Sequence, residues 1–463
     1  MSVNQSKQGH PKGLYLLFAT ELWERFSYYG MRGLLTLFLT KAAIEGGLGF
    51  QNEDAVLIYG YFTGFVYFTP IIGGAIADQY LGQRLAILIG GVLMMFGQFS
   101  LAYSAYMGPE QLMFTWIGLL LLIVGNGFFK PNISTIVGEL YEQGDPRRDA
   151  GFTIFYMGIN VGAFLAPLVC GFLAEDYFAV KASDGKTIVK YAFQYGFLAA
   201  GCGMFLGQVM FNLLAQKYLG DLGRHSNKQK NANKGADQTN QPLTNAERDR
   251  MSVIFVITIF VTFFWAGFEQ AGSSLTIYTD QFIDRELFGF IIPTSWFQSV
   301  NPLFIVALAP IISGIWVSLA SKNKDLSIPV KMGLGMILLG FGYFFMVGAV
   351  LERGDAGDDP SVKAALIWLL ATYFFHTVGE LCLSPIGLSM ITRLAPIKFA
   401  SMLMGVWFLS PFVAQIAGGY IAAYVEELGP LTIFTAIAIF VIAAGLVLFL
   451  IARTLITKMH GRG

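Results

Sequence analysis

Charged side chains interrupt several stretches of this sequence that are otherwise apolar. They are Glu21, Glu24, Arg25, Arg32, Lys130, Glu269 and Glu380. An ionisable group at the centre of a bilayer costs at least about 2.5–3.5 kcal/mol on insertion scales. A set that contains both signs therefore predicts a polar cavity inside a membrane protein, where the charges offset one another.

The charges nearest the start of the chain have helical spacing. Steps of i,i+4 and i,i+7 place on one helix face Glu21, Arg25, Tyr29 and Arg32. Glu24 and Tyr28 form a further i,i+4 step beside them. Acids outnumber bases in the whole set, and a buried carboxylate without a basic partner takes up a proton readily. The excess indicates coupling to a proton gradient.

His376 is the only histidine within a predicted span. An imidazole there can titrate near neutrality and carry a proton. A hydrogen-bonded histidine in the protein core is the more common case, so we expect a structural residue, and a coupling role stays open.

The sequence lacks the patterns of an enzyme or a metalloprotein. The three cysteines, Cys170, Cys202 and Cys382, have neither metal-ligand nor disulfide-framework spacing. Neither a nucleophile elbow nor a phosphate-binding loop occurs. The formal net charge of +0 argues against nucleic acid. We expect no catalytic residue, metal or cofactor and no nucleic-acid partner.

Composition places nearly the whole chain in a lipid bilayer. Of the 463 residues, 55% are hydrophobic and 13% are charged, which is the balance of a membrane protein. A span needs about 20 mostly apolar residues. We predict an all-α polytopic protein with helices near 14–43, 55–77, 84–106, 111–137, 150–174, 190–218, 251–279, 296–320, 330–351, 362–390, 398–424 and 430–456.

A polar segment divides these helices into two sets of six. The stretch from Asp221 to Arg250 is rich in Asn, Gln, Lys and Gly and has no run long enough to span. Most Lys and Arg outside the spans lie on the side of the termini, which the positive-inside rule places in the cytoplasm. The predicted parts are a cytoplasmic tail 1–13, a bundle 14–219, a cytoplasmic linker 220–250, a bundle 251–457 and a cytoplasmic tail 458–463. Paired bundles rock about a central site in secondary transporters.

The loop between the second and third predicted helices carries Gly74, Asp78, Gly82 and Arg84 at regular spacing. Glycines allow a tight turn, and an acid and a base at a helix boundary can pair or cap. In this position the pattern resembles the loop motif of the major facilitator superfamily, where it helps to hold one conformation.

The string ELWERFSYYG at 21–30 resembles the signature of the proton-dependent oligopeptide transporter family, also called the peptide transporter family. Further matches are GNGFFKPN at 125–132, FTIFYMGINVG at 152–162, FFWAGFEQ at 263–270, SVNPLF at 299–304 and HTVGELCLSP at 376–385. Because the matches cover both halves, the resemblance implies the major facilitator fold and import of di- and tripeptides with protons. It also implies a bacterial inner membrane and a chain that functions as a monomer.

The resemblance assigns roles to individual side chains. It implies that Arg25 and Lys130 hold the peptide carboxylate, and that Glu380 with Asn160 and Asn301 receives the amino terminus. The side-chain pockets would be formed by Tyr28, Tyr29, Tyr67 and Tyr156, with Trp265, Trp296 and Trp407 as weaker candidates.

The same resemblance implies gating ion pairs and proton carriers. It pairs Arg32 with Glu269 across the halves and places Lys130 near Glu380. The expected proton-handling acids are Glu21, Glu24 and Glu269, with Glu24 beside Arg25 as the first choice.

The sequence departs from the family pattern at three places. The segment from Asp221 to Arg250 cannot supply the two extra helices that many bacterial members have. The second helix has no histidine, so coupling falls to carboxylates. Pro411 lies near small polar family positions after Trp407, which leaves the shape of that pocket wall open.

The sequence is also compatible with functions other than peptide import. Relatives that carry nitrate, another anion or a peptide-like drug share the superfold, but nitrate relatives tend to lose the Glu24-Arg25 signature and Lys130. A drug/proton antiporter would have a glycine- and proline-rich fifth helix, which is not evident at 151–171. A sensor without transport stays possible from sequence, and a membrane enzyme lacks its motifs.

Overall fold

Long helices make up most of the protein. The computed structural model describes residues 9–142, 145, 147–226, 243–322, 324–354, 357, 359–396 and 399–461. The first set of helices is α1 (Lys12–Thr40), α2 (Asn52–Ile76), α3 (Gln83–Met107), α4 (Leu112–Glu139), α5 (Arg148–Gly171) and α6 (Phe193–Leu219). The second set is α8 (Asn245–Phe268), α10 (Val300–Ser321), α11 (Ile328–Glu352), α12 (Leu366–Leu394), α13 (Ala400–Leu428) and α14 (Pro430–Lys458).

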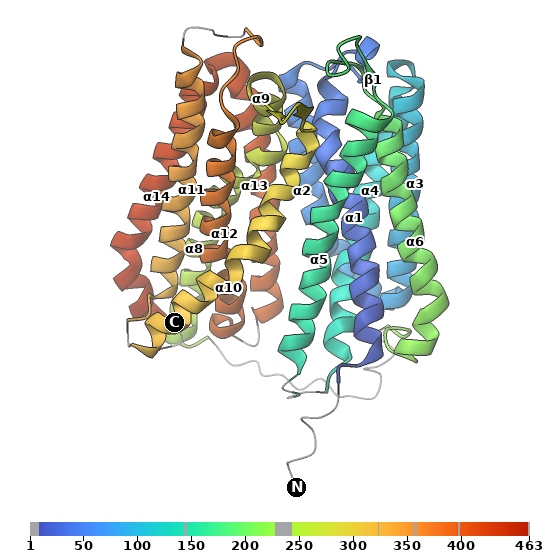
Figure 1. Ribbon diagram of the computed structural model, residues 1–463. Helices are drawn as coiled ribbons and strands as arrows, with labels where there is room; N and C mark the ends of the chain where they lie inside the picture. Colours follow the sequence, from blue (N-terminus) through green and yellow to red (C-terminus); the bar gives the residue numbers. More distant parts are fainter. Residues whose placement is uncertain are drawn as a thin grey trace.

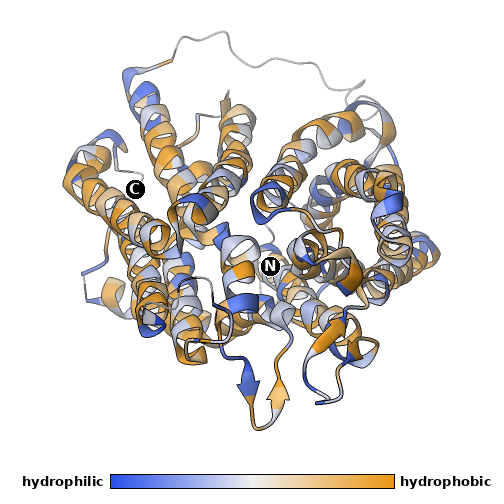
Figure 2. Ribbon diagram, turned by 90° about the horizontal axis from the view of Figure 1, so that it is seen from above, coloured by the Kyte–Doolittle hydropathy of each residue, from blue (hydrophilic) through white to orange (hydrophobic). Residues whose placement is uncertain are grey.

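Length and composition suit these helices to a bilayer. Within the described ranges, 11 helices are long and apolar enough to cross a membrane. The remaining long helix, α1, has 29 residues but carries the charged stripe around Arg25. Large apolar side chains such as Leu450 and Leu213 are 82% and 74% exposed, as lipid-facing residues must be. Figure 2 shows hydrophobic residues along the helices of both bundles.

The two sets form separate bundles, each with its own hydrophobic core. One buried cluster draws only on residues between Leu14 and Leu219, and a second only on residues between Val253 and Met459. Figure 1 shows α1 to α6 on one side and α8 to α14 on the other. Independent cores allow the bundles to move as rigid bodies. The predicted six-plus-six architecture is therefore confirmed.

The two ends of the molecule differ. α1 begins and α14 ends at the same end, which we call the terminal end (Figure 1). Two antiparallel hairpins lie at the opposite end, which we call the hairpin end. They pair β1 (Val180–Lys181) with β2 (Ile188–Lys190), and β3 (Glu286–Leu287) with β4 (Phe290–Ile291).

The second hairpin is closed by two residues with positive φ, Phe288 at 51° and Gly289 at 83°. Positive φ at both central residues is the requirement of a type I′ turn. Sequence patterning predicted helices alone and missed both hairpins, because such short strands carry no periodic signal.

The start of α8 and the continuity of the span that it begins also differ from the prediction. α8 begins at Asn245, inside the segment predicted as a linker, because Thr244 and Glu247 form a reciprocal capping box. The span predicted at 251–279 is not one helix, since a 3-10 turn η6 (Glu269–Gly272) separates α8 from α9 (Ser274–Phe282). The predicted linker residues 227–242 lie outside the described residues.

Candidate functional site

A buried ionic group lies at the middle of α1. Arg25 donates from Nη2 to Glu24 Oε1 at 2.8 Å, and its Nε lies 3.2 Å from Glu21 Oε1. Asn126 of α4 donates to Glu24 at 3.3 Å. The three charged residues are at most 4% exposed. One guanidinium therefore holds both carboxylates, a fork geometry for which arginine is suited.

Close packing behind Arg25 fixes its position. A Cβ on Gly162 would lie 2.5 Å from the Leu22 carbonyl oxygen and 2.9 Å from Arg25 Cβ. Only glycine allows α5 to approach α1 this closely. On the same helix Asn160 donates to the Tyr156 carbonyl at 3.0 Å, and the Tyr156 side chain is 51% exposed.

An ion pair joins the two bundles two helical turns further along α1, toward the hairpin end. Arg32 of α1 pairs with Glu269 of η6, and Arg32 Nε also donates to the Tyr59 hydroxyl at 2.5 Å. Both charged side chains are buried. The sequence did not distinguish Tyr59, which lies in the same apolar stretch as Tyr67. A buried pair between two bundles is costly to break because either partner left alone is an uncompensated charge.

The basic and acidic residues assigned to the peptide ends lie on different bundles. The Lys130 ammonium lies 4.6 Å from the centre of the Tyr67 ring. Glu380 accepts a hydrogen bond of 2.8 Å from Asn301, which also donates to Thr377 at 3.0 Å. Within the described part of the chain no ion pair joins Lys130 to Glu380.

Among the aromatic candidates, Tyr28 and Tyr29 of α1 lie beside the two arginines of the same helix. The Arg25 guanidinium carbon lies 5.5 Å from the Tyr28 ring centre, and that of Arg32 lies 5.9 Å from the Tyr29 ring. The two rings make an edge contact with each other at 5.3 Å. These tyrosines can therefore contact a ligand held by either arginine.

The tryptophans occupy three different surroundings. Trp265 packs on Phe264 and Phe268 within α8. Trp407 is 8% exposed and belongs to the core of the second bundle. Trp296 lies in η7 (Thr294–Ser299) and donates to the Leu168 carbonyl at 3.0 Å. Trp296 thus joins the bundles at the hairpin end, and a pocket role for it has no support from its contacts.

His376 lies inside the second bundle. Its ring centre is 4.7 Å from that of Tyr343, and the residue is 2% exposed. These surroundings are those of a core histidine.

The loop motif holds the end of α6. Gly82 has φ 76° and ends the π-helical turn η3 (Ala77–Leu81). Arg84 donates to the Gly220 carbonyl at 2.6 Å and to the Ala215 carbonyl at 3.3 Å, while Gln83 donates to Asp78 at 3.3 Å. A Cβ added at Gly74 would lie 3.4 Å from the Pro131 side chain of α4.

A second group of buried charges at the hairpin end was missed by sequence reasoning. Asp280 of α9 pairs with Lys41 at 2.5 Å and with Arg285 at 3.1 Å. Glu175, in the π-helical turn η5 (Phe172–Tyr177) that follows α5, accepts from the backbone of Thr294 at 2.7 Å. We call these residues the hairpin-end cluster. The only sequence signal was an acid just beyond the end of a predicted span.

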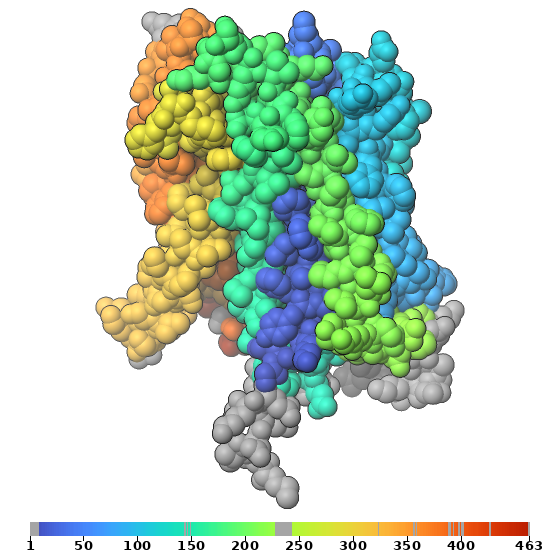
Figure 3. Space-filling view, turned by 45° about the vertical axis from the view of Figure 1, so that its right-hand side comes forward, coloured from blue at the N-terminus to red at the C-terminus, as the bar shows by residue number. Residues whose placement is uncertain are grey.

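The molecule is closed at the hairpin end and hollowed toward the terminal end. Besides the hairpin-end cluster, Thr36 donates to the Gly272 carbonyl at 2.6 Å and Ser299 to the Phe164 carbonyl at 2.7 Å, both across the bundles. Figure 3 shows a hollow between α5 and α10 that widens toward the end at which α1 begins. In the most apolar 18-residue stretch of Thr294–Ser321, which contains most of α10, only 6% of the residues are buried.

Comparisons with known proteins agree with this arrangement. A family model described as the POT family matches residues 84–234 and 224–433. The peptide transporter YePEPT of Yersinia enterocolitica is 34% identical over 98% of this chain and 97% of its own length. A di-/tripeptide transporter of Lactococcus lactis is 30% identical over 97% of each chain.

Solved structures show the same fold. A crystal structure of a peptide transporter POT in complex with sulfate superposes with a TM-score of 0.86, at 34% identity over 98% of this chain and 97% of that one. A mutant of a peptide transporter POT in complex with alafosfalin superposes with a TM-score of 0.84. The predicted major facilitator fold is confirmed by these neighbours, and the chain belongs to the POT family of membrane transporters.

Proposed function

We propose that this protein imports di- and tripeptides together with protons by alternating access. The observation that carries the proposal is the division of charge between the bundles. Arg25 and Lys130 lie on the first bundle, whereas Glu380, hydrogen-bonded to Asn301, lies on the second. A zwitterionic peptide has a carboxylate at one end and an ammonium at the other. Binding both ends therefore joins the two bundles through one ligand.

Proton coupling follows from the competition for Arg25. In the structure the Arg25 guanidinium is shared by Glu21 and Glu24. A peptide carboxylate that binds the same guanidinium draws it away from one of these acids, whose negative charge is then less well neutralised. Such an acid is stabilised by taking up a proton, so peptide and proton bind together.

The closed hairpin end gives the direction of access. If the termini are cytoplasmic, as the Lys and Arg distribution predicts, the cavity of this structure opens to the cytoplasm. Release of the hairpin-end cluster and of the Arg32–Glu269 pair would then open it outward. The site lies between bundles of one chain, so we infer that a monomer in the inner membrane is sufficient.

The driving force is adequate for accumulation. One proton crossing 100 mV gains about 2.3 kcal/mol, and one pH unit adds about 1.4 kcal/mol. Since each tenfold concentration ratio costs roughly 1.4 kcal/mol, the total supports a several-hundred-fold peptide gradient.

Uptake of labelled dialanine into proteoliposomes tests the proposal. An inward proton gradient should cause accumulation, and a protonophore should reduce uptake to equilibration. Accumulation that persists with the protonophore would refute proton coupling, and no uptake of any peptide would refute the substrate class.

A further inference from the structure

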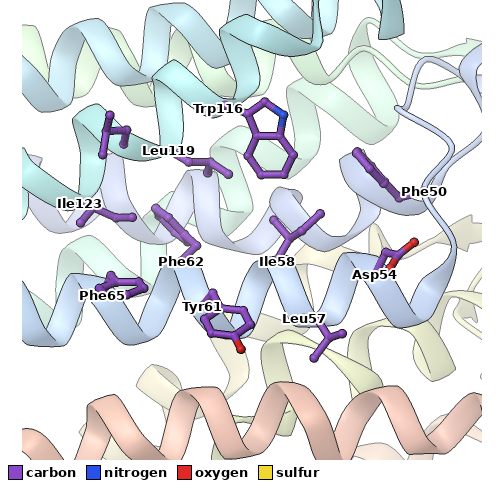
Figure 4. A pocket seen from close by; sticks show the side chains of 11 residues that line it. Phe50, Asp54, Leu57, Ile58, Tyr61, Phe62, Phe65, Trp116, Leu119 and Ile123 are labelled. Atoms are coloured by element: carbon purple, nitrogen blue, oxygen red, sulfur yellow. The ribbon is translucent and has the colours of Figure 1, made fainter.

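An apolar groove with a volume of about 630 Å³ lies on the outer face of the first bundle, between α2 and α4. Figure 4 shows side chains of α2 facing side chains of α4, from Asp54 and Phe50 at one end of the groove to Phe65 and Ile123 at the other. Leu119 and Phe62 are 4% and 2% exposed. The groove is separate from the charged residues of α1 and from the peptide site proposed above.

Its length matches one leaflet of a bilayer. From Asp54 to Phe65 the helix rises about 16 Å at roughly 1.5 Å per residue. Half of a hydrocarbon core of about 30 Å is about 15 Å. α2 begins at Asn52 at the hairpin end, so the groove runs from the membrane surface toward its midplane. Trp116, 44% exposed, lies beside Ile58, in the half of the groove nearer to Asp54, and exposed tryptophans are enriched in the interfacial region of a bilayer.

One charged group marks the surface end of this groove. Asp54 is the only charged residue among the described residues that line it, and its side chain is exposed. Glu53 and Glu110 add negative charge near the same ends of α2 and α4. A carboxylate accepts hydrogen bonds and has none to donate. The groove therefore matches apolar chains attached to a headgroup that carries positive N–H donors, and it repels an anionic headgroup.

We propose that this groove binds a phospholipid with a primary-amine headgroup, of the phosphatidylethanolamine type. The acyl chains lie over Leu57, Ile58 and Leu119, and the ammonium donates to Asp54. An ammonium with three N–H donors satisfies a carboxylate directly, whereas a trimethylammonium has no donor to offer. Under the proposed orientation the lipid belongs to the outer leaflet.

The groove also reaches the contact between the bundles. Tyr61 lines it, and its hydroxyl lies 2.7 Å from that of Tyr420 on α13. Figure 4 shows Tyr61 with its hydroxyl directed toward that helix. A bound lipid therefore contacts a side chain that joins the two bundles.

Native mass spectrometry of the purified full-length chain tests the proposal. After delipidation, the protein is titrated with phosphatidylethanolamine, phosphatidylcholine and phosphatidylglycerol of identical acyl chains. We expect the first lipid to bind up to about fivefold more tightly than the others, because a contact between an ammonium and an exposed carboxylate contributes about 0–1 kcal/mol. Asp54→Asn should remove this preference. Glu53→Gln, which changes the adjacent acid outside the groove, should keep it.

Two further measurements separate the groove from other sources of binding. Leu120→Trp fills the groove from an exposed wall position and should weaken binding of all three lipids without loss of folding. Glycerophosphoethanolamine, which has the headgroup without chains, should not displace the bound lipid. Equal binding of the three lipids, an unchanged preference in Asp54→Asn, or displacement by the soluble headgroup would each overturn the proposal.

Discussion

Glu175 of the first bundle accepts hydrogen bonds from two backbone N–H groups at the start of η7 in the second bundle. Its Oε2 lies 2.7 Å from Thr294 N and its Oε1 lies 3.0 Å from Ser295 N. The carboxylate is 2% exposed. Both oxygens are thus committed to the other bundle, which makes Glu175 a direct connection across the closed hairpin end.

Glu175→Gln should weaken this closure. The amide keeps one acceptor but presents N–H donors to the second backbone N–H, so one charge-assisted hydrogen bond of about 1.5–3 kcal/mol is lost. We expect the population opened at the hairpin end to rise about tenfold or more. Spin labels on Val180→Cys and Leu287→Cys, on the two hairpins, report the separation in a Cys202→Ala background, because Cys202 is the exposed native cysteine among the three.

The matched control for this experiment is Asp176→Asn. Asp176 follows Glu175 but pairs with Lys181 of the same bundle, so its loss should leave the distance distribution unchanged. Identical distributions for Glu175→Gln and the unmutated protein would contradict a closing role for Glu175.

Lys41 should stabilise the same closed end over the whole physiological pH range. Burial lowers the pKa of Lys41, but the Asp280 carboxylate raises it further, so the net pKa lies above its usual range. A raised pKa gives a contribution that is full below the unfolded value of about 10.4 and is lost only as pH rises through the higher folded value. Lys41 therefore stays charged between pH 6 and pH 8. Its ion pair with Asp280 should cause no change in the spin-label distances of the unmutated protein over that range.

Lys41→Met should open the hairpin end, whereas Lys186→Met should not. The Lys41–Asp280 pair has side-chain exposures of 20% and 6%, and the Lys186–Glu286 pair has exposures of 45% and 44%. Exposed pairs contribute about 0–1 kcal/mol, and buried ones are costly to break. Thermal unfolding and the same spin labels compare the two variants, and equal effects would refute this ranking.

Intramembrane charge was the part of the site that sequence could predict. Arg25 and its neighbours stand out because a charge in a bilayer must be compensated. Glu175 and Asp280 do not stand out, because acids at the ends of spans are ordinary and their partners depend on how two short hairpins fold. Counting charges also could not show that Glu380 has a neutral partner, Asn301, while Glu21 and Glu24 share one arginine.

Lys130→Ala should abolish proton-driven uptake and weaken peptide binding. The Lys130 ammonium lies over the Tyr67 ring and has no ion pair within the described part of the chain, so its charge is available to a peptide carboxylate. Loss of one charge-assisted bond of about 1.5–3 kcal/mol corresponds to roughly a 10- to 150-fold higher Kd for dialanine. Titration calorimetry with dialanine measures the change.

Two controls isolate the carboxylate contact. Lys217→Ala removes another lysine that lies over a ring, at 5.3 Å from Tyr218, on the outer surface, and should leave Kd unchanged. Dialanine amide lacks the carboxylate and should bind the unmutated protein and Lys130→Ala about equally weakly. A large loss of amide binding in Lys130→Ala would show that Lys130 does not act on the carboxylate.

Glu24→Gln should separate proton coupling from peptide binding. Glu24 accepts from Arg25 and Asn126 and is 0% exposed, and glutamine keeps its shape while it imitates the protonated acid. The variant should fail to accumulate dialanine under a proton gradient, yet it should exchange external for preloaded peptide, since exchange needs no net proton movement. Arg25→Ala removes the charge that we propose binds the peptide carboxylate, and it should lose both activities. Glu21→Gln is the matched comparison, because Glu21 contacts the same guanidinium at 3.2 Å. If Glu24→Gln accumulates peptide as well as the unmutated protein while Glu21→Gln does not, the coupling acid is Glu21.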